Sequence, residues 1–87
     1  MVFFAHTRQG YENYLSLGLT ATAPLWVTAD VLQEDELHGP ELQGANVTVF
    51  NWTIEPGDTE AIAGAMHTIA EHHSGHTIWA EGTAAVD

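Results

Sequence analysis

The sequence predicts an α+β domain in which a small antiparallel or mixed sheet of four to five strands carries one main helix on one face. Two patterns support this fold. Several short segments alternate apolar and polar residues with the two-residue period of a strand. One segment late in the chain spaces its apolar residues three and four positions apart, as a helix does. The 87 residues leave room for a single domain, residues 1–87.

The first part of the chain is predicted to be extended. Residues 2–5 are all apolar, as in a strand that is buried on both faces. Residues 14–23 alternate leucine or alanine with other residues, which predicts a long, half-buried strand. After Pro24, residues 25–28 predict a short edge strand, where a neighbouring proline is tolerated.

The rest of the chain is predicted to contain two helices and two strands. They are a short helix over 30–37, a strand over 46–54, the main helix over 58–73 and a last strand over 77–80. Asp58 is the expected N-cap of the main helix, and Gly75 is its expected end. The small residues of 82–87 are expected to form a frayed tail.

The charge of the chain is extreme, because 12 Asp and Glu residues face a single cation, Arg8, and the formal net charge is -11. Such a surface repels itself in dilute buffer, whereas salt of 1 M shortens the screening length to about 3 Å. In this composition the whole chain resembles the short acidic proteins of haloarchaea. The resemblance includes no motif, and it implies a salt-rich cytoplasm. The alternative is an acidic domain of a mesophile.

Composition also excludes several classes of function. Cysteine is absent, so disulfides and thiolate metal sites are excluded. Nucleic-acid binding needs a basic surface, which one arginine cannot provide. Residues 1–6 have no basic region, and their apolar run is too short for a signal peptide or a membrane span. We therefore expect no nucleic-acid or membrane partner and a cytoplasmic location.

Histidines are the strongest chemical signal. Four of the six fall within ten positions: His67, His72, His73 and His76. Together with Glu71 or His6 they are candidate ligands for Zn²⁺ or another divalent ion. Within the predicted helix, however, no two stand four apart, as helical ligand pairs do. The competing interpretation makes His73 a partly buried core residue and places His67 beside Glu71 on the solvent face.

No motif in the sequence identifies a reaction, a catalytic residue or an organic cofactor. The favoured hypothesis is a non-catalytic protein-interaction or assembly module in a salt-rich cytoplasm. A homodimer is expected, because an 87-residue core is small and the apolar ladder of residues 15–23 needs a cover. The alternative hypothesis is a small histidine-dependent enzyme or metal-binding protein.

Overall fold

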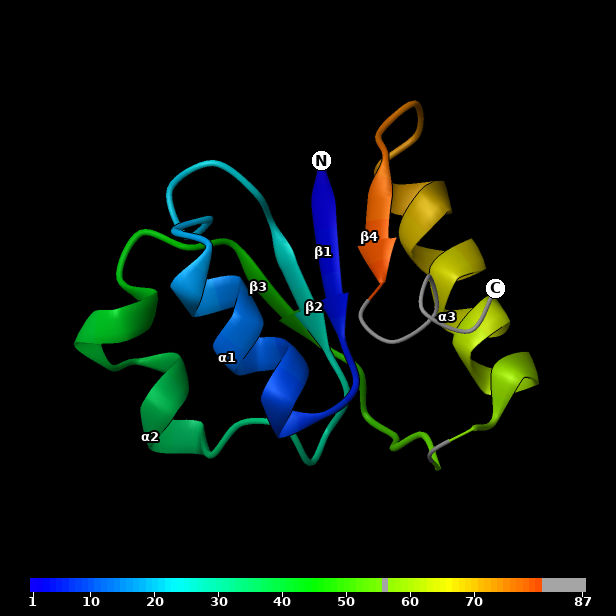
Figure 1. Ribbon diagram of the computed structural model, residues 1–87, viewed down its shortest axis with the longest axis horizontal. Coiled ribbons are helices and arrows are strands. Elements are labelled where there is room, and N and C mark those ends of the chain that lie inside the picture. Colours follow the sequence, from blue (N-terminus) through cyan, green and yellow to red (C-terminus); the bar gives the residue numbers. More distant parts are fainter. Residues whose placement is uncertain (56, 81–87) are drawn as a thin grey trace.

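The computed structural model describes residues 1–55 and 57–80, in which strands and helices alternate along the chain (Figure 1). The elements in chain order are β1 (Val2–Ala5), α1 (Arg8–Ser16), β2 (Leu25–Val27), α2 (Glu34–Leu37), the 3-10 helix η1 (Pro40–Leu42), β3 (Val47–Val49), α3 (Thr59–His72) and β4 (Ile78–Ala80). Across the described residues, no helix combines the length and the apolar character needed to cross a lipid bilayer. The predicted tail, residues 82–87, lies outside the described residues.

The strands form one sheet in the order β3-β2-β1-β4, and each neighbouring pair is parallel. The prediction of an antiparallel or mixed sheet was therefore wrong. Parallel neighbours need a crossover connection, usually a helix, and each connection between these strands contains one. Helices α1 and α2 lie on one face of the sheet, and α3 lies on the other (Figure 1).

The topology was missed because residues 14–23 are not a strand. Helix α1 occupies Arg8–Ser16, and turns lead from there to β2. Thr7 caps the helix, since its hydroxyl accepts a hydrogen bond from the backbone N–H of Gly10 at 3.1 Å. Tyr11 and Tyr14, three residues apart, point into the core. The helix thus supplies the crossover that makes β1 and β2 parallel.

The sheet has a hydrophobic core on each face. Successive residues of β1 alternate between them, so Val2 and Phe4 join the core under α3, whereas Phe3 and Ala5 join the core under α1. The prediction that residues 2–5 form a strand buried on both faces is confirmed. All four side chains are buried because β1 lies between β2 and β4, with helices above and below.

The main helix was predicted to within one residue at each end. Helix α3 spans Thr59–His72, and the carboxylate of Asp58 accepts a hydrogen bond from the backbone N–H of Ala61 at 3.1 Å. The predicted strand over 46–54 shrinks to Val47–Val49, and the predicted helix over 30–37 shrinks to Glu34–Leu37. These shorter elements leave longer loops after the carboxyl ends of β2 and β3.

Candidate functional site

The carboxyl ends of the strands are the first place to look for a site. Doubly wound parallel sheets bind ligands there, where the strand order reverses, which in this fold is between β1 and β4. The hydroxyl of Thr7, which follows β1, is engaged as the cap of α1. Arg8 is engaged as well, since its guanidinium donates to both carboxylate oxygens of Glu36 at 2.7 and 2.6 Å. The chain after Ala80 lies outside the described residues.

The Arg8–Glu36 pair joins α1 to α2. The side-chain hydrogen bonds from Arg8, and then the backbone N–H of Gln33, lower the pKa of Glu36 to about 2. The guanidinium also donates to the backbone carbonyl of Val31 at 3.2 Å. Arg8, the one Lys or Arg of the sequence, therefore uses its guanidinium to hold α2 and the chain before it, so it does not form an open anion site.

The four candidate histidines do not converge on one metal site. Within residues 1–55 and 57–80, no three His, Asp or Glu side chains are placed to hold an ion together. His67 lies on the exposed side of α3, with its Nε2 3.8 Å from Glu71, as predicted. The other three histidines lie at the end of α3 and just after it. His72 and His73 contact the ring of Trp26, and His76 contacts the ring of His73.

His73 is partly buried, as predicted, and its partner is Trp26 on β2. The indole N–H of Trp26 donates to His73 Nε2 at 3.1 Å. Because an indole nitrogen can only donate, Nε2 must be the unprotonated nitrogen of this imidazole. The ring of His72 lies 5.4 Å from Trp26, and the ring of His76 lies 6.2 Å from that of His73. No local pattern indicates Trp26 as this partner, because it lies 47 positions away from His73.

Charge divides the molecule into two ends. Three connections reach the amino-terminal edge of the sheet, namely residues 17–24, 43–46 and 73–77, and none of them contains Asp, Glu, Lys or Arg. We call these connections, together with the side chains of Met1 and Trp79, the uncharged edge. In Figure 1 it forms the upper part of the molecule, where the four strands begin.

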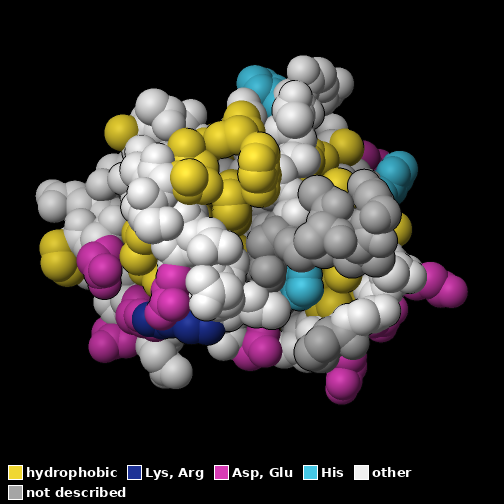
Figure 2. Space-filling model, in the orientation of Figure 1, with side chains coloured by type: hydrophobic (Ala, Val, Ile, Leu, Met, Phe, Trp, Pro, Cys, Tyr) yellow, Lys and Arg dark blue, Asp and Glu magenta, His cyan; other side chains and the backbone are white. Residues whose placement is uncertain are grey.

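Most of the described carboxylates lie at the opposite end, in the segments that follow β2 and β3. They are Asp30, Glu34, Asp35, Glu36, Glu55, Asp58 and Glu60. The others are Glu12 in α1, Glu41 in η1 and Glu71 in α3. Figure 2 shows most of the Asp and Glu side chains along the lower part of the view, away from the strand beginnings.

The uncharged edge also exposes large apolar side chains. Leu17 is 58% exposed, Trp79 is 55% exposed and Met1 is 43% exposed. Trp79 pairs in register with Phe3 on β1, so both side chains lie on the α1 face of the sheet. Figure 2 shows hydrophobic side chains gathered in the upper middle of the view, near where β1 begins in Figure 1. An apolar patch surrounded by polar surface is typical of a protein-docking site.

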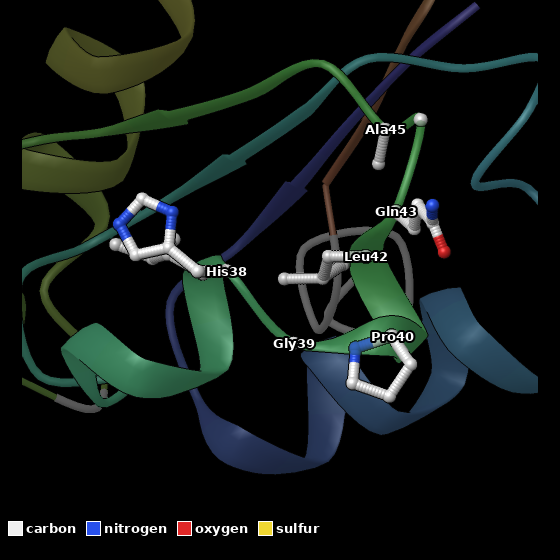
Figure 3. A pocket seen from close by; sticks show the side chains of 8 residues that line it. His38, Gly39, Pro40, Leu42, Gln43 and Ala45 are labelled. Carbon is white, nitrogen blue, oxygen red and sulfur yellow. The ribbon is translucent and has the colours of Figure 1, made fainter.

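Two hollows adjoin this edge. The smaller, about 200 Å³, lies within it and is lined by residues 20–24, Gly44 and Asn46. The larger, about 520 Å³, extends from the end of α2 past η1 and is lined by Leu37–Pro40 and Leu42–Ala45. Figure 3 shows it, with His38 on one side and Pro40, Leu42 and Gln43 on the other. Gly44 lines both hollows, and neither lining contains an acidic or basic residue other than His38.

Sequence reasoning therefore found the histidines but missed the exposed apolar residues. The signal that could have located them was the run from Leu17 to Pro24, which lacks charge in a chain of net charge -11. That signal was interpreted as a strand. Comparison with known proteins adds no further guide: no protein-family model matches the chain, and neither a curated protein nor a solved structure does.

Proposed function

We propose that this chain is a non-catalytic protein-interaction module that docks through the uncharged edge, and that its partner is a second copy of itself. The observation behind the proposal is that Leu17, Trp79 and Met1 are exposed at the end of the molecule whose three connections contain no Asp, Glu, Lys or Arg. Shielding them from water would stabilise a docked pair. An 87-residue domain gains most from such help, because its own core is small.

Charge favours this edge as the contact between two copies. Each copy has a formal net charge of -11, so contact through the acidic end would bring carboxylates of the same sign together. The uncharged edge lets two copies meet with the carboxylates that follow β2 and β3 far from the contact. A twofold axis through the edge gives an isologous contact, in which the same residues are used by both copies.

Association through this edge is tested by Trp79→Ser. In about 1 M salt, where repulsion is screened, light scattering is expected to report twice the chain mass of 9.4 kDa for the wild type and a monomer for Trp79→Ser. The matched control is Trp52→Ser, because Trp52 is also exposed, at 38%, but lies beyond the carboxyl end of β3. A wild type that stays monomeric at high protein concentration would contradict the proposal.

We further propose that the protein works in a salt-rich cytoplasm, because its carboxylates are numerous and nearly all lack a basic partner in the sequence. Lowering the salt from about 1 M to about 0.1 M is then expected to lower the melting temperature, as carboxylates in and around α2 begin to repel one another. The measurement is calorimetry of the monomeric Trp79→Ser variant, which removes any effect of association. An unchanged melting temperature across this range would argue against halophilic adaptation.

The alternative, a histidine-dependent metal-binding protein or enzyme, is supported by one observation. His72 is exposed and held in a fixed tautomer at the end of α3. A histidine with one ring nitrogen anchored and the residue exposed is suited to bind a metal ion once a second copy supplies further ligands, and this favours metal binding over catalysis in a single copy.

A further inference from the structure

We infer that two copies docked through the uncharged edge hold one Zn²⁺ ion between them, with His72 and His76 of each copy as the four ligands. The inference rests on the proposed function, because it needs the second copy at this edge. It places a metal ion at the contact between the copies, because the described residues of a single copy form no complete site for that ion.

His72 is prepared as a ligand. Its Nδ1 lies 3.0 Å from the backbone carbonyl oxygen of Thr68. A carbonyl oxygen can only accept, so Nδ1 carries the proton and Nε2 keeps its lone pair. Metal-binding histidines usually have this anchor, in which the nitrogen away from the metal donates to a carbonyl or carboxylate. The residue is exposed, so Nε2 is open to a metal from solvent.

His73 has a different role, because its Nε2 already accepts the indole N–H of Trp26. Together with Trp26, it positions the rings of His72 and His76. The ring of His72 packs against Trp26 at 5.4 Å, and the ring of His76 meets His73 edge-on at 6.2 Å. The backbone N–H of His76 also donates to the carbonyl of His73 at 3.1 Å, which fixes the turn between them. Both exposed imidazoles thus pack against the hydrogen-bonded pair of Trp26 and the partly buried His73.

A single copy provides only half of a zinc site. Zinc takes four ligands at a structural site and at least three protein ligands at a catalytic one. In the part of the chain that the structure describes, no three His, Asp or Glu side chains are placed to hold one ion, so His72 and His76 of one copy would need ligands from a second copy. A twofold axis beside residues 72–76 doubles two imidazoles to four, the usual number for zinc. The net charge of -11 on each copy also raises the local concentration of cations.

The test is a zinc titration of the full chain by calorimetry, with the mass followed by light scattering. We expect one Zn²⁺ per two chains and a dimer at least about tenfold tighter with zinc than with EDTA. The variants His72→Gln and His76→Gln are expected to lose both effects. His67→Gln and His38→Gln are the matched controls, since both residues are exposed and lie outside the proposed site, and they are expected to behave as the wild type.

Cobalt provides an independent readout. Co²⁺ in the wild-type dimer is expected to show the visible absorption of a tetrahedral ion, which His76→Gln removes. A dimer in EDTA that gains nothing from zinc would overturn this inference while leaving the proposed function intact, as would zinc binding that survives both His72→Gln and His76→Gln. A monomer in EDTA at every concentration would instead overturn the proposed metal-free docking.

Discussion

Replacing Trp26 with alanine is expected to lower the free energy of unfolding by about 3–5 kcal/mol, the usual cost of removing a buried aromatic ring. Trp26 is only 5% exposed, and its ring packs against Phe50 at 5.2 Å and against two histidines at the end of α3. The substitution leaves a cavity between β2 and α3 and removes the partner of His73. Since a domain of this size is stable by roughly 4–13 kcal/mol, the variant would lose a large share of its stability.

Urea unfolding followed by circular dichroism measures this effect. Trp52→Ala is the control, because it removes the same side chain from an exposed position, and we expect a cost of less than about 1 kcal/mol. Trp26→Phe keeps most of the ring but removes the N–H donor, so its cost should fall between the two. Equal costs for Trp26→Ala and Trp52→Ala would show that the aromatic core under α3 is wrongly described.

Replacing Tyr14 with alanine is expected to cost a further 3–5 kcal/mol or so on the opposite face of the sheet. Tyr14 is fully buried, and its ring packs against Phe3 at 5.4 Å. Its hydroxyl donates to the backbone carbonyls of Ala23, at 2.6 Å, and Leu19, at 3.3 Å. The side chain therefore holds the connection between α1 and β2, which is part of the uncharged edge.

Tyr14→Phe separates the hydroxyl from the ring. Its expected cost is about 0.5–1.5 kcal/mol, that of one hydrogen bond. Burial raises the pKa of the Tyr14 hydroxyl above its ordinary value, so this group stabilises the fold fully below pH 10 and loses that contribution as the pH rises through the raised pKa. Unfolding at pH 8 and pH 11 should show a smaller loss for Tyr14→Phe than for the wild type. Equal losses would contradict the assignment.

The elements predicted correctly are those whose signals are local. The cap and the apolar period of α3 lie within the helix itself, and β1 is apolar at every position. Helix α1 was missed because the alternation of Leu15, Leu17 and Leu19 runs across the end of the helix, where Ser16 is the last helical residue. Once that helix was read as a strand, the parallel order of the sheet could not be predicted.

The candidate site depends even more on distant contacts. Helical spacing was enough to place His67 on the surface and His73 against the core. The tautomer of His73, however, is set by Trp26, and the apolar end of the molecule exists only because the sheet is parallel. Parallel strands bring all their preceding connections to one edge, and no local pattern reveals that residues 17–24, 43–46 and 73–77 are neighbours.

The separation of charge along the strands makes the molecule an electric dipole, with a negative pole at the carboxyl ends and a neutral pole at the amino-terminal edge. Two copies that meet at their neutral poles place their dipoles head to head, so that the pair has no net dipole and presents a negative pole at each outer end. In the proposed pair, a third copy would approach the carboxylates that follow β2 and β3. Like charge at the outer ends would then favour a closed pair over a fibre without any steric block.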